Sequence, residues 1–205
     1  MRNRHNQLFG LVQRLNYNTT PLPKMIAMTD EVRLPDPTNV IPRLTRGSAL
    51  ILRHYGMPSR AALAAKLAPL CRQHGVRLLI ANDARLAYAV HADGIHLSEY
   101  ALRHGLHTWR HWCPAQWLVT AAAHTPVALR RAAMIGADAA LLAPVFPTAS
   151  HPERMSIGTL RLARWSRESP LPVYALGGID ISTIRRLTGC PLAGIAGIGE
   201  FKREL

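Results

Sequence analysis

The sequence predicts a single α/β domain built as a (β/α)8 TIM barrel. Eight short apolar runs are spread along the chain, and helical segments lie between them. Similar junctions, at residues 92–94, 137–139 and 192–194, lead from a helix end into an apolar run. Repeated units of a strand and a helix are typical of a parallel sheet, and eight of them close a barrel. A doubly wound open sheet is the alternative, but no G-x-G-x-x-G follows the first run.

Composition is that of one globular domain. The chain has 205 residues, of which 48% are hydrophobic, enough for a sizeable core. No apolar stretch approaches the ~20 residues of a membrane-spanning helix, and the basic start lacks the apolar segment of a secretory signal. Cys71, Cys113 and Cys190 are far apart and form no C-x-x-C, which argues against disulfides. We therefore expect a cytoplasmic protein without a membrane partner.

The charge balance favours an anionic partner. The net charge is +13 and the isoelectric point is near 11.0. The positive residues are mostly arginines spread thinly along the chain, with no basic block and no nucleic-acid-binding motif. We expect an anionic small molecule rather than nucleic acid, while an Arg-rich solvated surface without a partner stays open as an alternative.

The strands follow from the apolar runs. Residues 1–24 are polar and basic and predict an N-terminal extension with a short helix, since Leu8, Leu11, Val12 and Leu15 have helical spacing. Residues 25–205 form the predicted barrel. Each run in it is short and apolar throughout, as a strand buried on both faces requires. The expected strands cover residues 25–28, 49–52, 76–80, 94–97, 117–123, the run from 139, 172–176 and 192–198.

The helices follow from periodicity and from their end signals. The clearest begins after Pro58-Ser59, ends at Gly75 and repeats apolar residues at helical spacing from Ala62 to Cys71. Another begins at Thr125-Pro126 and ends at Gly136. Three prolines between residues 35 and 42 permit only an irregular helix before the second strand. Shorter helices are expected at residues 86–90, 101–105, 158–165 and 181–187.

The carboxyl ends of the strands carry the candidate site, because a barrel brings them to one rim where ligands bind. The hydroxyls of Thr148 and Ser150 can donate to an anion. Glycines after the seventh and eighth strands, Gly177, Gly178 and Gly199, let backbone N–H groups approach the same anion. These residues predict a phosphate site, and tight turns without a ligand are the alternative reading of the glycines.

Five segments carry a resemblance to a known family. They are Asn82-Asp83, Ala92-Asp93-Gly94-Ile95-His96-Leu97, Pro144-Val145-Phe146-Pro147-Thr148, Ala175-Leu176-Gly177-Gly178-Ile179 and Gly194-Ile195-Ala196. In this order and separation they resemble the thiamine phosphate synthase/TenI family, from about residue 25 to the C-terminus. The resemblance implies a (β/α)8 barrel that is often oligomeric, so a homo-oligomer is expected. It implies that synthase members join a pyrimidine diphosphate to a thiazole phosphate with Mg²⁺, whereas TenI members isomerise a thiazole carboxylate phosphate.

The chain departs from the family pattern on the diphosphate side. Arg53 matches the family's arginine, but Tyr55 stands where the pattern has lysine. Asp83 matches one Mg²⁺-binding aspartate, and only Glu99 could substitute for the second. The resemblance thus implies Mg²⁺ as cofactor, while the missing aspartate argues against an intact metal site. His151 replaces a further lysine, which removes another cation that would stabilise a departing diphosphate.

The monophosphate side is better preserved, which favours a ligand with a single phosphate. The resemblance assigns ligand contacts to Asn82, Thr148, Ser150, His151, Gly177, Gly178, Ile198 and Gly199. It assigns catalytic roles to Arg53 and to His124, which can transfer protons near neutral pH. We therefore expect a thiamine biosynthesis protein that binds a phosphorylated thiazole, as a synthase or a thiazole tautomerase. A catalytically weak phosphate-binding or regulatory protein on the same fold is the alternative.

Overall fold

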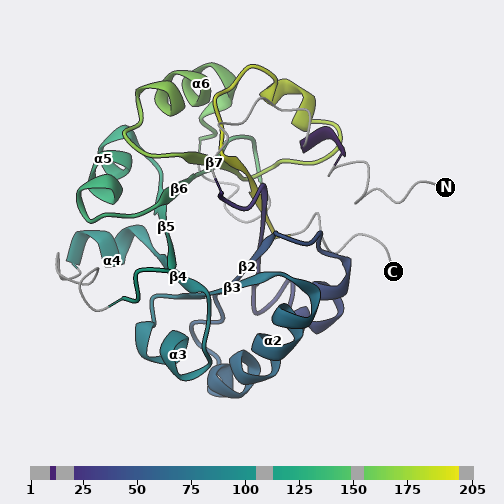
Figure 1. Cartoon of the computed structure of the whole chain (residues 1–205). Helices are drawn as coiled ribbons and strands as arrows, with labels where there is room; N and C mark the ends of the chain where they lie inside the picture. The colour runs from purple at the N-terminus through teal and green to yellow at the C-terminus, as the bar shows by residue number, and fades with distance from the viewer. Residues whose placement is uncertain (1–9, 13–20, 105–112, 149–154, 199–205) are drawn as a thin grey trace.

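Eight parallel strands form a closed barrel in the computed structural model of the chain (Figure 1). The structure describes residues 10–12, 21–104, 113–148 and 155–198. The strands pair in chain order, and β8 closes the sheet against β1, so the predicted (β/α)8 barrel is confirmed and the open sheet is excluded. They are β1 Met25–Met28, β2 Ala49–Leu52, β3 Arg77–Ala81, β4 Gly94–Leu97, β5 Leu118–Ala123, β6 Ala139–Leu142, β7 Val173–Leu176 and β8 Gly194–Gly197.

The strands are apolar throughout because both of their faces are buried. Alternate side chains point into the barrel or toward the surrounding helices. The barrel interior holds one apolar cluster that includes Ile51, Leu79 and Leu141, and a larger cluster fills the layer between strands and helices. Tyr174 lies in the interior, where its hydroxyl donates to the carbonyl of Pro23 at 2.6 Å.

The repeated junctions close the amino end of the sheet. The carboxylate of Asp93 accepts from the N–H of Leu78 at 2.7 Å, and that of Asp138 accepts from the N–H of Val119 at 2.7 Å. Each aspartate thus ties the start of its own strand to the preceding strand. A Cβ on Gly94 would lie 1.9 Å from the carbonyl oxygen of Leu118, so this position requires glycine.

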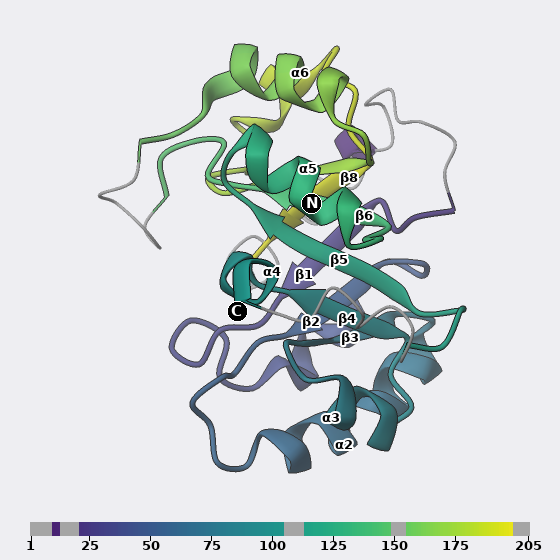
Figure 2. The same cartoon turned by 90° about the vertical axis from the view of Figure 1, so that its left-hand side faces the viewer.

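Helices surround the barrel (Figure 2). They are the α-helices α2 Arg60–His74, α3 Ala84–Ala89, α4 Glu99–His104, α5 Pro126–Met134 and α6 Gly158–Glu168, with the 3-10 helices η1 Pro37–Asn39, η2 Ile41–Arg43 and η4 Ile184–Leu187. The helix expected at residues 181–187 is therefore a shorter 3-10 turn. The helix predicted before the barrel lies mostly outside the described residues. Of its described residues, Val12 is buried in the larger apolar cluster between strands and helices. Within the described residues no helix has both the length and the apolar character needed to span a membrane.

Candidate functional site

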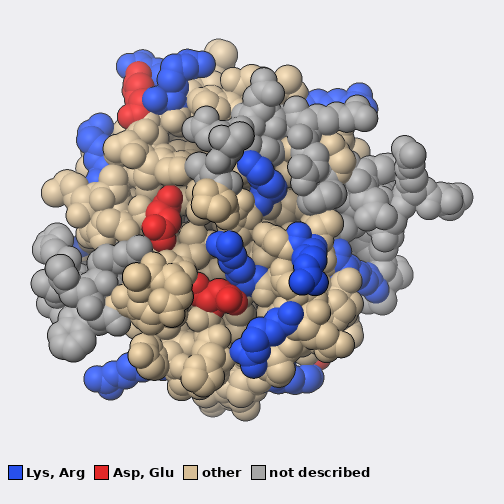
Figure 3. All heavy atoms as spheres, in the orientation of Figure 1, with Lys and Arg blue, Asp and Glu red and all other residues tan. Residues whose placement is uncertain are grey.

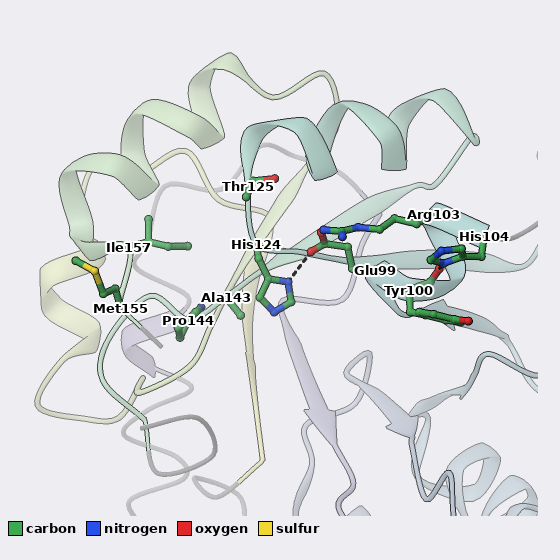
Figure 4. Close-up of a pocket in the computed structure, with 10 residues that line it drawn as sticks. All are labelled: Glu99, Tyr100, Arg103, His104, His124, Thr125, Ala143, Pro144, Met155 and Ile157. Atoms are coloured by element: carbon green, nitrogen blue, oxygen red, sulfur yellow. Dashed lines mark hydrogen bonds and ion pairs between the residues drawn. The ribbon is translucent and has the colours of Figure 1, made fainter. Parts of the chain in front are cut away.

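A cavity of about 550 Å³ opens at the carboxyl ends of β4, β5 and β6 (Figure 4). Its walls include Glu99 and His124 on one side and Ala143, Pro144, Met155 and Ile157 on the other. The volume lies in the range of small-molecule sites. Charged and imidazole groups therefore face an apolar wall across a space that can hold a metabolite.

Glu99 holds His124 in one orientation. One carboxylate oxygen of Glu99 accepts from Nδ1 of His124 at 2.8 Å, and the other accepts from the guanidinium of Arg103. The side chain of Glu99 is 13% exposed, and that of His124 is 33% exposed. Because the carboxylate only accepts, Nδ1 carries the proton and Nε2 is left as the basic atom. Burial alone would raise the pKa of Glu99, but the hydrogen bonds from Arg103 and His124 hold that pKa below its ordinary value.

Helix α4 supplies one end of the cavity. The rings of Tyr100 and His104, one turn apart, lie with their centroids 4.3 Å apart, and Nδ1 of His104 approaches the carbonyl of Tyr100 at 3.0 Å. Both side chains line the cavity beside Arg103. This end of the cavity is therefore basic and aromatic.

Arg53 lies at the end of β2 and is fixed through its backbone. Its N–H donates to the hydroxyl of Thr29 at 3.0 Å, and that hydroxyl contacts Nδ1 of the buried His54 at 2.8 Å. Nε2 of His54 lies 3.1 Å from the carbonyl of Pro35, which can only accept, so Nε2 donates there and Nδ1 accepts from Thr29. These bonds join the loops after β1 and β2 around Arg53.

His96 is a buried neutral imidazole rather than an acid–base group. It is 3% exposed, and its Nδ1 lies 2.9 Å from the hydroxyl of Thr120 on β5. Burial, with a smaller effect of the positive charge of Arg53, lowers the pKa of His96 to about 3. His96 therefore stays neutral at physiological pH.

Asn82 and Asp83 tie the ends of β3 and β4 to neighbouring elements. The amide of Asn82 donates to the hydroxyl of Ser98 at 2.9 Å and accepts from the N–H of Ser98 at 2.8 Å. Asp83 caps α3 by accepting from the N–H of Leu86 at 2.9 Å. Its other oxygen lies 3.6 Å from the guanidinium of Arg60.

The predicted phosphate site comprises the hydroxyl loop after β6 and the glycine turns after β7 and β8. Gly177 and Gly178 have φ of +97° and +63°, and the backbone of Phe146 bonds to Gly177 at 3.0 Å. Thr148 follows this contact and Ile198 is buried after β8, which brings both to the same end of the barrel as Gly178. Ser150, His151 and Gly199 lie outside the described residues, so the structure does not test the complete phosphate cup.

The described residues do not fit a magnesium site. A magnesium ion requires carboxylate oxygens free to coordinate it in near-octahedral geometry. Both oxygens of Asp83 and both oxygens of Glu99 already contact donors of the chain. Within the described part of the chain, no group of three or more His, Cys, Asp or Glu side chains is arranged to hold a metal.

The sequence pattern missed three of the residues that shape this rim. Arg60 reads as the solvent-facing first turn of α2, Arg103 as part of a short helix, and Met155 as a loop residue. Only Arg103 had a usable signal, because it lies four residues after Glu99, the spacing at which helical side chains form ion pairs. The pairing of Glu99 with His124, 25 residues apart, has no local signal.

Basic side chains are distributed over the face seen along the barrel axis (Figure 3). They form separate groups, with acidic side chains and uncharged surface among them. The net charge of +13 is therefore not concentrated in one band on this face.

Comparisons with known proteins identify relatives of the chain. The chain is 33% identical over 187 residues to a protein of Aquifex aeolicus provisionally named thiamine-phosphate synthase 2, covering 88% of this chain and 98% of that protein. It is 34% identical over 140 residues to thiamine-phosphate synthase of Prochlorococcus marinus (strain MIT 9313), covering 68% of this chain but only 39% of that protein.

Structural comparison supports the fold. Thiamine phosphate pyrophosphorylase from Pyrococcus furiosus superimposes with a TM-score of 0.71 at 24% identity, covering 85% of each chain. The family model described as thiamine monophosphate synthase matches residues 36–201. Because this match covers well over half of the sequence, the chain belongs to the thiamine monophosphate synthase family.

Proposed function

We propose that this protein binds a phosphorylated thiazole at the carboxyl end of the barrel and catalyses its tautomerisation with His124 as the proton carrier. Family membership supports a role in thiamine biosynthesis. The observation that favours tautomerisation is the hydrogen bond of 2.8 Å between Glu99 and His124 beside the cavity. It leaves Nε2 of His124 as the base.

The proposed reaction moves one proton and changes no oxidation state. Nε2 of His124 takes a proton from one position of the thiazole, and the electron pair of the broken bond shifts into the ring system. Glu99 stabilises the imidazolium that forms. Nε2 then returns the proton at a second position of the same molecule. Proton transfer of this kind typically contributes ~10²–10⁴ in rate.

Synthesis of thiamine phosphate is a second candidate, which the names of the relatives favour. In that reaction a diphosphate must leave, and cations must stabilise its developing charge. Lysine is absent at Tyr55 and His151, and the carboxylates of Asp83 and Glu99 contact groups of the chain itself. The missing lysines and the occupied carboxylates favour a ligand with a single phosphate, such as a thiazole phosphate, over a diphosphate.

The test follows proton exchange and isomerisation of thiazole carboxylate phosphate in D₂O by NMR. We expect His124→Asn to lower the exchange rate by ~10²–10⁴ and Glu99→Gln by about 10–100-fold, with ligand affinity retained. His91→Asn is the matched control, because His91 is exposed in the turn before β4, and its φ of +53° suits asparagine.

Three outcomes contradict the proposal. Ligand binding without exchange in the wild type would leave a phosphate-binding or regulatory protein. Formation of thiamine phosphate from the pyrimidine diphosphate and thiazole phosphate with Mg²⁺ would establish the synthase. An unchanged exchange rate in His124→Asn would remove His124 as the proton carrier.

A further inference from the structure

Two arginines contact Asp83, which the family resemblance assigns to a divalent metal, and Glu99, which could substitute for the missing second aspartate. Nη1 of Arg60 lies 3.6 Å from Oδ2 of Asp83, and Nη2 of Arg103 donates to Oε1 of Glu99. The two pairs come from different helices, α2 and α4. Each pair independently shows an arginine bound to a carboxylate that could otherwise coordinate a metal.

Arg60 is held in this position by more than its ion pair. Its guanidinium donates to the backbone carbonyls of Leu52 and Ala81, the last residues of β2 and β3, and lies 5.7 Å from the centre of the Tyr55 ring. Its side chain is only 14% exposed. A guanidinium held by two backbone carbonyls, a carboxylate and a ring face presents a permanent charge, because arginine does not lose its proton in proteins.

Each carboxylate oxygen of Asp83 and Glu99 already contacts a donor of the chain. Oδ1 of Asp83 caps α3 through the N–H of Leu86 at 2.9 Å, and Oε2 of Glu99 accepts from His124 at 2.8 Å. The remaining oxygens are the two that contact Arg60 and Arg103. A divalent cation at these carboxylates would compete with both arginines for the same oxygens.

We infer that Arg60 and Arg103 are internal counter-ions that replace a divalent metal, so that the site takes a phosphate monoester without Mg²⁺. This inference concerns the charge of the site and does not depend on whether the protein transfers a proton. The expected ligand is a phosphate monoester with one or two negative charges and no bound metal. A diphosphate bound as its magnesium complex is excluded.

The experiment measures Mn²⁺, an EPR-visible substitute for Mg²⁺, against the wild type, Arg60→Gln, Arg103→Gln and the double variant. We expect no saturable binding to the wild type up to about 1 mM, the weak end of protein sites for hard cations. The double variant should bind at least tenfold more tightly, and adding Asp83→Asn to it should abolish the gain.

Two results would overturn the inference. One is saturable Mn²⁺ binding by the wild type that Asp83→Asn removes, and the other is no gain of affinity in any arginine variant. Circular dichroism verifies folding. If loss of Arg60 unfolds the barrel, Arg103→Gln alone decides, because its side chain is 57% exposed and its removal frees an oxygen of Glu99. Binding of thiazole phosphate, measured separately with and without Mg²⁺, keeps this result distinct from failure of the proposed reaction.

Discussion

Gly178 offers a sharp test of the phosphate turn, because an alanine there meets two separate obstacles. Its φ is +63°, and a Cβ would lie 2.5 Å from the carbonyl oxygen of Pro147 and 2.8 Å from Cβ of Phe146. Contacts under 3.0 Å require the neighbours to move. Gly189 is the matched control, since its φ is +84° but a Cβ there would meet no atom within 4 Å.

Comparing the two substitutions separates the free-energy cost of a positive φ from the cost of the steric clash. Gly189→Ala should cost about 1–2 kcal/mol for a left-handed alanine. Gly178→Ala should cost the same plus roughly 1–3 kcal/mol for overpacking, about 2–5 kcal/mol in all. For a chain of this size, each kcal/mol lowers the melting temperature by about 2–4 °C.

The assays are thermal unfolding and titration with thiazole phosphate. Gly178→Ala should unfold several degrees below Gly189→Ala and should also bind the ligand more weakly, because Pro147 precedes Thr148 in the predicted phosphate loop. Equal melting temperatures for the two variants would refute the expected steric clash of a Cβ at position 178 with Pro147 and Phe146. Unchanged ligand affinity in a destabilised Gly178→Ala would refute the assignment of this turn to the phosphate.

Two further predictions concern the barrel interior. The pKa of His96 is about 3 in the folded chain and about 6.5 when unfolded, so below pH 6.5 only the unfolded state gains the proton and stability falls as pH falls. Between pH 7 and 5, the free energy of unfolding measured in urea should fall by about 2 kcal/mol less in His96→Gln than in the wild type. An identical pH dependence in both proteins would contradict this. Tyr174→Phe should cost about 1–3 kcal/mol, since the buried carbonyl of Pro23 loses its donor. Tyr88→Phe, on an exposed side chain, should change stability by under about 0.5 kcal/mol, and equal effects would show that the hydroxyl of Tyr174 contributes nothing.

The position of the site along the chain was predictable because it follows from the order of strands. Polar residues and glycines come directly after apolar runs, and a parallel barrel brings all such positions to one rim. His124 and Gly178 are therefore at the expected end, and Asn82 follows β3 as predicted. Helical spacing also indicated α2 and α5, though not that the segment at residues 181–187 would shorten to η4.

The partners of these residues could not be predicted in the same way. Glu99 was a candidate metal ligand in the sequence, and in the fold it orients His124 and binds Arg103. Arg60 had the pattern of a solvated helix residue, yet it contacts the ends of two strands. The contacts of Arg60 and the bond between Glu99 and His124 depend on the distance and direction of side chains from different units of the barrel, which periodicity does not encode. Glu99 and Arg103, in contrast, pair within one helix.

The sequence alone is sufficient to predict the barrel, its eight strands and the end of the barrel at which the candidate site lies. It could do so because burial on both faces imposes an apolar run and a change of polarity at each strand end, both of which are local signals. The pairing of Asp83 with Arg60 and of Glu99 with His124 is known only from the fold, because each pair joins different units of the barrel. Pairing of neighbouring strands brings α2 close to the end of β3 at Asp83 and α4 close to the end of β5 at Glu99, and the charge balance of the candidate site depends on these two contacts.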